Sequence, residues 1–191
     1  MNKSRVEAFS DGVIAIIITI MVLGFSVPKG ETLIALLPLF SNFLTYALSF
    51  FYVGIYWANH HHLWQAAEKV TGKVLWANLH LLFWLSMLPV ATSWMGASHF
   101  RPISVAFYGL ILLITSIAWY ILVYFVKSEA GKDSIIYKAF QKDNKIKTSI
   151  FIYGFATCLS FIMPYLSVVI YLIVALLWVI PDKRIEKHFY Q

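Results

Sequence analysis

Runs of residues without a charged side chain divide this chain into blocks of similar length. A helix of roughly 20 residues crosses the hydrocarbon core of a bilayer, which is about 30 Å thick. The uncharged runs reach or approach that length, and short polar segments separate them. The pattern predicts six membrane-spanning helices, over residues 12–28 with an extension back towards residue 5, 33–57, 74–95, 102–126, 147–163 and 165–180.

The boundary between the last two predicted helices depends on one proline. Residues 148–181 form a stretch of 34 residues without a charge, which is too long for one helix unless that helix is strongly tilted. Pro164 has no backbone N–H and its ring clashes with the preceding turn, so it interrupts a helix that runs through it. We therefore expect two short helices joined by a tight turn at Pro164.

The composition places these helices in lipid. Of the 191 residues, 60% are hydrophobic and only 13% are charged, too few polar groups to cover a soluble domain of this size. The single cysteine, Cys158, excludes an intramolecular disulfide. We expect an all-α integral membrane protein whose residues 1–191 form a single six-helix transmembrane domain.

The distribution of lysine and arginine predicts the orientation. If the N-terminus is cytoplasmic, thirteen of the fifteen basic residues fall on the cytoplasmic side, six of them in residues 127–147. Only Lys29 and Arg101 fall on the other side, as the positive-inside rule requires. We therefore expect a multi-pass protein of the plasma membrane with both termini in the cytoplasm. The same cytoplasmic lysines and arginines, which face anionic lipid headgroups, explain the net charge of +6. A nucleic-acid partner is therefore not required to explain it.

Polar residues of the first three predicted helices fall at one depth near the cytoplasmic side. Ionisable groups inside a membrane are costly unless they are paired, so a network joining the three helices is the favoured explanation. Histidines that simply lie at a membrane interface are the alternative for at least one member. The residues at this depth are Arg5, Ser10, Asp11, Trp57, Asn59, His60, His61, His62, Asn78 and His80.

A metal centre or an enzyme active site fits this layer poorly. Adjacent histidines on a helix point about 100° apart, so at most two of His60, His61 and His62 converge on one ion. The chain contains no His-Glu-x-x-His pattern, no paired cysteines and no serine elbow with a matching base. We expect neither a resident metal nor catalytic residues.

The first predicted helix carries an apolar stripe. Ile16, Ile20 and Leu23 stand at i, i+4 and i+7 and share one face, with Thr19 about 60° to the side. Spacing alone favours an ordinary stripe that faces lipid or packs against a neighbouring helix.

The segment before that stripe resembles a known family. Arg5, Phe9, Ser10 and Asp11, followed by an isoleucine-rich helix, are similar to the first helix of the transmembrane protein 175 potassium channels in their prokaryotic single-repeat form. The resemblance extends to three polar residues of the next two helices and to the six-span length. Those residues are Trp57, His61 and Asn78. Gly12 departs from the pattern, because a small residue such as alanine is expected there.

The resemblance implies a potassium-selective homotetramer built around four copies of the first helix. It implies a hydrophobic gate, with a pore constriction at Ile16, Ile20 and Leu23, and a role for Thr19 in ion selectivity. It also implies a structural network within each subunit, and no cofactor besides the permeant potassium ion. The implied members of that network are Arg5, Ser10, Asp11, Trp57, His61 and Asn78.

Two other functions remain open at this point. A secondary transporter is expected to show repeat symmetry and a charged or broken-helix site near the midplane, and neither is visible in the sequence. An accessory membrane protein needs no water path at all. The third possibility is a channel. This sequence contains no TVGYG-like carbonyl filter, so the ion selectivity of a channel would have to come from another feature. Its pore must also lie between subunits, because six short helices without a continuous polar face cannot enclose one.

Overall fold

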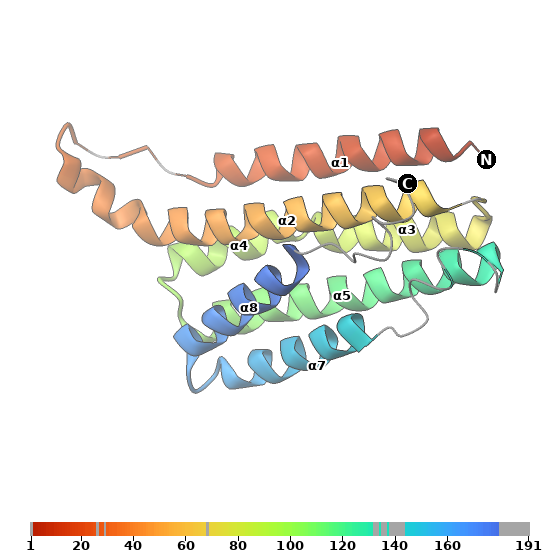
Figure 1. Ribbon diagram of the computed structural model, residues 1–191. Helices are drawn as coiled ribbons and strands as arrows, with labels where there is room; N and C mark the ends of the chain where they lie inside the picture. Colours follow the sequence, from red (N-terminus) through yellow and green to blue (C-terminus); the bar gives the residue numbers. More distant parts are fainter. Residues whose placement is uncertain are drawn as a thin grey trace.

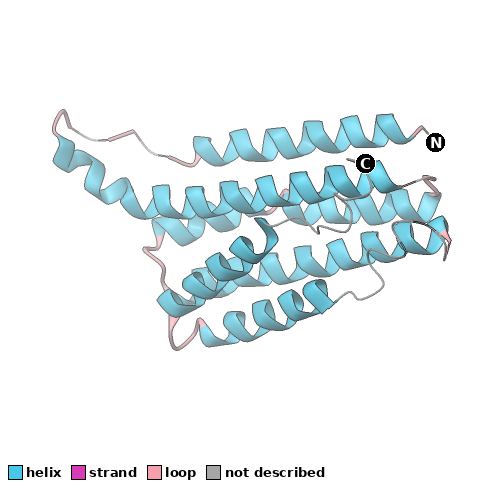
Figure 2. Ribbon diagram, in the orientation of Figure 1, coloured by secondary structure: helices cyan, strands magenta, loops and turns pink. Residues whose placement is uncertain are grey.

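The computed structural model describes residues 2–25, 27–28, 30–67, 69–131, 134, 137 and 144–179, apart from the side chain of Pro38. Within these residues the regular structure is entirely helical (Figure 2). The helices are α1 (Lys3–Leu23), the 3-10 helix η1 (Leu33–Leu39), α2 (Phe40–Ala66), α3 (Gly72–Leu85), α4 (Leu88–Ala97), α5 (Pro102–Ala130), α7 (Asn144–Leu159) and α8 (Pro164–Val179).

The helices of the described residues form six membrane crossings, with α3 and α4 together making one of them. This confirms the predicted all-α fold and its six spans. Three stretches are long and apolar enough to cross a bilayer on their own: Lys3–Leu23, Gly72–Ala97 and Pro102–Ala130. Helix α2 is 27 residues long but more polar, and α7 and α8 have 16 residues each. Helix α8 begins at Pro164, where the sequence predicts the break.

The third predicted helix is divided in two, which the prediction of one helix over residues 74–95 missed. A turn at Ser86 and Met87 separates α3 from α4, and Pro89 stands in the first turn of α4. Because proline has no N–H to donate, the usual helical bond from residue 89 to the Leu85 carbonyl cannot form. The two halves still pass through the bundle as one crossing.

The ends of the first two predicted helices also differ. Helix α1 ends at Leu23 and is capped by Gly24, so it is shorter than the predicted helix, which ends at residue 28. Helix α2 begins seven residues later than the predicted residue 33, after the separate turn of η1. It runs past the predicted end at Trp57 to Ala66, because the histidine run continues the helix.

Helix α1 lies at the outer edge of the bundle (Figure 1), where it packs on α2, α3 and α4. Helix α5 lies centrally and contacts α3, α4, α7 and α8. The inner face of α1 repeats every three or four residues, as a helix buried on one side requires. The buried residues of that face are Val6, Ser10, Ile14, Ile17 and Met21.

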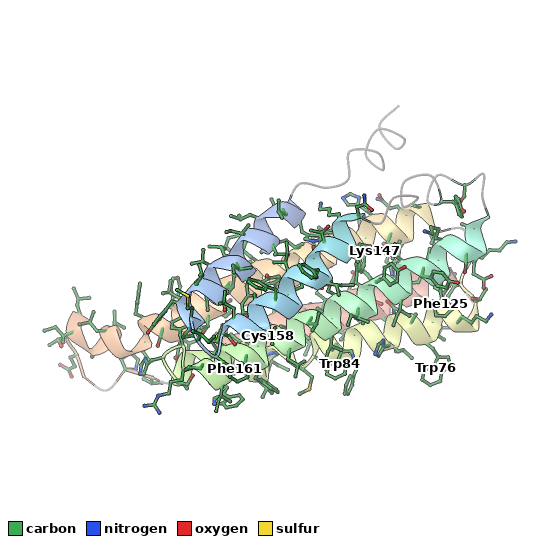
Figure 3. All side chains as sticks on the ribbon, turned by 90° about the horizontal axis from the view of Figure 1, so that it is seen from below. Trp76, Trp84, Phe125, Lys147, Cys158 and Phe161 are labelled. Atoms are coloured by element: carbon green, nitrogen blue, oxygen red, sulfur yellow. The ribbon has the colours of Figure 1, made fainter. Side chains whose placement is uncertain are left out.

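The outer surface of the bundle is rich in large apolar and aromatic side chains. Trp76 and Trp84 project outward from α3, and Phe161 lies at the turn between α7 and α8 (Figure 3). The exposed fraction is 73% for Trp76 and 61% for Phe161. Such a surface suits lipid or a further protein chain, since soluble monomers rarely expose apolar patches of this extent.

Helices α2 and α4 approach closely at Gly96. A Cβ atom at this position would lie 2.7 Å from Thr45 Oγ1 and 2.9 Å from Asn42 Cα, so the α2 backbone itself stands in the way. We expect Gly96→Ala to lower the free energy of unfolding by about 1–3 kcal/mol, as overpacking of a filled core does. Thermal unfolding of the purified protein in detergent measures the effect.

Gly54→Ala is the matched control, because a Cβ atom there meets nothing within 4 Å. Equal melting temperatures for the two variants would show that the close approach of α2 and α4 is wrong.

Candidate ion pathway and its polar support

The apolar stripe of α1 lies on the face that points away from the subunit. The side chains of Ile16, Ile20 and Leu23 are 57%, 46% and 80% exposed, and Thr19 beside them is exposed as well. The buried residues Ile14 and Ile17 lie on a different face of the helix. A single subunit therefore leaves this stripe uncovered, with a hydroxyl beside it.

The Thr19 hydroxyl is bound to its own helix. Its Oγ1 atom donates to the carbonyls of Ile16 at 2.9 Å and of Ala15 at 3.2 Å. A hydroxyl has one proton and two acceptor lone pairs, so the proton is engaged while the oxygen keeps acceptor capacity. This oxygen therefore keeps lone pairs that can accept a further hydrogen bond on the exposed face of α1.

A buried chain of hydrogen bonds supports α1 from behind. Ser10 Oγ donates to the Val6 carbonyl at 2.8 Å and accepts from Asn78 Nδ2 at 2.9 Å. The Nε2 atom of His60 lies 2.8 Å from Asn78 Oδ1 and 2.9 Å from Trp64 Nε1, and it either donates its proton to the Asn78 oxygen or accepts from the Trp64 indole. Ser10, His60 and Asn78 are all buried. These contacts join α1, α2 and α3 at one depth.

A second group of contacts lies nearer the surface. Trp57 Nε1 donates to Asp11 Oδ1 at 3.1 Å. His61 Nδ1 lies 2.9 Å from Glu7 Oε1, an ion pair when the imidazole is protonated. Both pairs join α1 to α2 at the cytoplasmic end of the predicted orientation.

The structure brings together some of the residues predicted for the network and not others. Ser10 meets Asn78, and Asp11 meets Trp57, as the contacts above describe. His61 contacts Glu7, which the sequence reasoning did not name as a member. Arg5 is exposed, and within the described residues of one subunit it makes no hydrogen bond or ion pair.

Of the two central members, His60 was named from the sequence only as one of the residues at this depth, and Trp64 was not named. His60, one position before His61, is the histidine that reaches Asn78, and Trp64 follows it by one helical turn. The i, i+4 spacing of His60 and Trp64 is the signal that could have identified the pair.

A chain of hydroxyl groups lies behind the far half of α1. Tyr108 Oη is 2.9 Å from Ser49 Oγ, which is 2.6 Å from Thr92 Oγ1. Thr92 donates to the Leu88 carbonyl at 2.7 Å, so the chain runs in one direction, from Tyr108 through Ser49 to Thr92. The sulfur atom of Met21 in α1 lies 3.9 Å from Thr92 Oγ1. This chain of hydroxyl groups joins α2, α4 and α5, and α1 packs on α2 and α4.

Comparisons with known proteins agree with this architecture. The family model described as "Endosomal/lysosomal potassium channel TMEM175" matches residues 5–89. A potassium channel of a Chryseobacterium species is 52% identical over 187 residues, covering 98% of this chain and 97% of the relative. The human endosomal/lysosomal proton channel TMEM175 is 36% identical over 114 residues, covering 53% of this chain and 23% of that protein.

A solved structure has the same fold. The crystal structure of a lysosomal potassium-selective channel TMEM175 homolog from Chamaesiphon minutus superposes with a TM-score of 0.81 at 26% sequence identity. The match covers 94% of this chain and 97% of that chain. The architecture thus defines an all-helical membrane protein with the fold of that channel, and its named relatives are channels and not enzymes. The chain belongs to the TMEM175 family.

Proposed function

We propose that this protein is a potassium-selective cation channel whose pore lies between subunits and is lined by the exposed face of α1. The observation that carries the proposal is the apolar stripe of Ile16, Ile20 and Leu23, which no part of the described subunit covers and which has the Thr19 oxygen beside it. The potassium channel from Chryseobacterium, related over nearly the full length, supports the choice of ion.

The pore needs several copies of the chain. In the part of the chain that the structure describes, the interior faces of the helices are filled mainly by packed apolar side chains, and no wide polar path runs through them. Closed rings of identical subunits place the same helix face on a common axis. We propose a homotetramer in lipid, with four copies of α1 on its axis. Potassium is the permeant ion, and no other cofactor is proposed.

The residues of the exposed face then have distinct tasks. Rings of Ile16, Ile20 and Leu23 form a hydrophobic constriction, which can close a water path by dewetting. Four Thr19 oxygens offer cation ligands next to the first ring. Their acceptor capacity is preserved because the hydroxyl protons bond within the helix.

The polar contacts behind α1 are proposed to hold the pore helix in place. Asp11, Ser10, Trp57, His61 and Asn78 contact residues of the subunit and lie away from the stripe. They therefore act on structure and do not touch ions. The exposed Arg5 guanidinium is proposed to complete this network where subunits meet.

Reconstitution into a planar bilayer tests the function. A channel gives stepwise currents that reverse near the potassium equilibrium potential when potassium is present at unequal concentrations. Saturable flux coupled to a second solute would instead identify a secondary transporter, and the absence of flux from assembled protein would identify an accessory membrane protein.

We propose a plasma-membrane location with both termini cytoplasmic, from the lysine and arginine bias. Lys29, Lys183, Arg184 and Lys187 lie outside the described residues, as does most of the segment between α5 and α7. Lys147 is described, exposed and close to the start of α7, so it reports the side on which that helix begins.

A cysteine at Lys147, in a Cys158→Ser background because Cys158 is exposed, is expected to resist a membrane-impermeant thiol reagent in intact cells. The same site should react after the cells are opened. Labelling from outside, with a cytoplasmic marker protein still unlabelled, would reverse the proposed orientation.

A further inference from the structure

The exposed face of α1 continues beyond the proposed constriction, towards the start of the helix. Helix α1 runs without a break from Lys3 to Leu23 (Figure 1), and positions seven residues apart on a helix lie within about 20° of each other around its axis. Phe9 stands seven residues before Ile16 and therefore shares its face. The side chain of Phe9 is 55% exposed, close to the 57% of Ile16. The face thus carries a large aromatic side chain about 10 Å nearer the cytoplasmic end of the predicted orientation.

Gly12 lies on α1 between these two side chains. It stands four residues before Ile16 and is rotated from it by about 40°, the same angle that separates Ile16 from Ile20. If the Ile20 side chain reaches the axis of an assembled ring, the position of Gly12 reaches it too. Gly12 is exposed, and a Cβ atom there would meet nothing within 4 Å in the described subunit. The face therefore has a gap between two bulky positions.

The gap at Gly12 changes what this face offers to an ion. Rings of isoleucine and leucine side chains exclude water by dewetting. Glycine has no side chain and leaves its backbone open to water, including a carbonyl oxygen with a lone pair to spare. The ring of Phe9 is apolar, but the face of an aromatic ring attracts cations. Water and a cation are therefore better accommodated at Gly12 than at the rings of the constriction.

We propose that Gly12 and Phe9 form the inner vestibule of the pore, in which a monovalent cation keeps its water before it enters the constriction at Ile16. Four copies of Gly12 leave room for the hydrated cation. Four Phe9 side chains narrow the cytoplasmic entrance and present aromatic surface to it. This inference rests on the proposed function, because only a ring of subunits around α1 encloses the gap.

A helix contact is the competing explanation of Gly12. Small residues allow membrane helices to pack closely, and Ala8 and Ala15 are further small, exposed residues of α1. A neighbouring helix packed on Gly12 would fill the gap. The two explanations differ in how they respond to a larger side chain, because a vestibule has room for leucine and a close helix contact has none.

Gly12→Leu fills the vestibule and tests the proposal in a planar bilayer. The single-channel potassium current should fall roughly tenfold, which corresponds to a barrier about 1.4 kcal/mol higher. Light scattering of the purified protein should give the mass of the unmodified assembly. Gly154→Leu is the matched control, because it adds the same side chain on α7 where a Cβ atom also meets nothing within 4 Å. This control should keep both the current and the mass.

Two results would overturn the vestibule. A normal current through assembled Gly12→Leu protein would mean that Gly12 lies away from the ion path. Loss of the assembly in Gly12→Leu, with Gly154→Leu still assembled, would mean that a neighbouring helix packs on Gly12.

Cysteine modification locates the vestibule by a second route. Channels of Phe9→Cys and Gly12→Cys, in the Cys158→Ser background, should lose current when a water-soluble thiol reagent is added on the side where α1 begins. The reagent should act more slowly from the other side, because the constriction then lies in its way. Modification that is no faster from the side where α1 begins would contradict the proposal.

Ile16→Cys separates this inference from the proposed function. If the reagent alters the current at Ile16 but at neither Phe9 nor Gly12, α1 lines the pore and the vestibule is wrong. If it alters the current at none of the three positions, α1 does not line the pore, and the proposed function and the vestibule are both wrong.

Discussion

Replacement of Ile16 by asparagine is expected to raise the potassium current through the assembled protein. In the proposed pore, four Ile16 side chains exclude water, and an amide in their place offers hydrogen bonds to the water that would fill the constriction. A reduction of about 1.4 kcal/mol in the barrier increases the current roughly tenfold. Because Ile16 is 57% exposed in the subunit, the change should leave the fold of each subunit intact. Recordings at equal protein density measure the difference.

Substitutions at Thr19 should have a different effect from those at Ile16. Thr19→Val and Thr19→Ala remove the hydroxyl oxygen without adding polar groups to the apolar rings. We expect currents to persist while the preference for potassium over sodium falls, as shown by the reversal potential with potassium on one side and sodium on the other. Thr19→Ser retains the hydroxyl and is the matched control, which should keep the selectivity. Insensitivity of the current to Ile16 and Thr19 variants that assemble normally would exclude α1 from the pore.

The largest loss of stability is expected for Asn78→Leu. Leucine has a similar volume but can neither donate to Ser10 Oγ nor pair with Nε2 of His60, and all three side chains are buried. Each buried polar group left without its partner costs about 1–3 kcal/mol. We therefore expect Asn78→Leu to lower the free energy of unfolding by several kcal/mol. We expect a strongly reduced yield of assembled protein and a lower melting temperature.

His80→Leu is the control for that experiment. His80 lies on the same helix, but its side chain is exposed, and its bond with Trp84 stays within α3. This variant should melt close to the unmodified protein. If Asn78→Leu were as stable as His80→Leu, the buried contacts between α1, α2 and α3 would not hold the subunit together.

The uncharged runs were sufficient to predict six crossings, because lipid requires long apolar helices whatever their detailed packing. Pro164 was recognised as a break because the stretch around it was too long for one span. Pro89 was missed because the apolar run around it has the length of a single helix. The sequence therefore gave no reason to divide that run, and only the geometry shows the turn at Ser86.

The polar layer shows where sequence reasoning stops. His60 and His61 are neighbours, and their side chains point about 100° apart on a helix. Which one faces the interior depends on the rotation of α2, and that rotation is set mainly by packing against α4 and α1. The same limit applies to α1, since Ile14 and Ile17 are as apolar as Ile16. Periodicity cannot distinguish the buried face from the exposed one, and the family resemblance made that choice.

A cysteine at Ile16 gives the most direct test of the claim that α1 lines a potassium pore. Channels of Ile16→Cys in the Cys158→Ser background would be recorded in a bilayer before and after a small water-soluble thiol reagent. The account predicts that modification changes the potassium current sharply. Modification of Val90→Cys, an exposed apolar position on α4, should leave the current unchanged. A current that the reagent alters at Val90 and not at Ile16 would contradict the account.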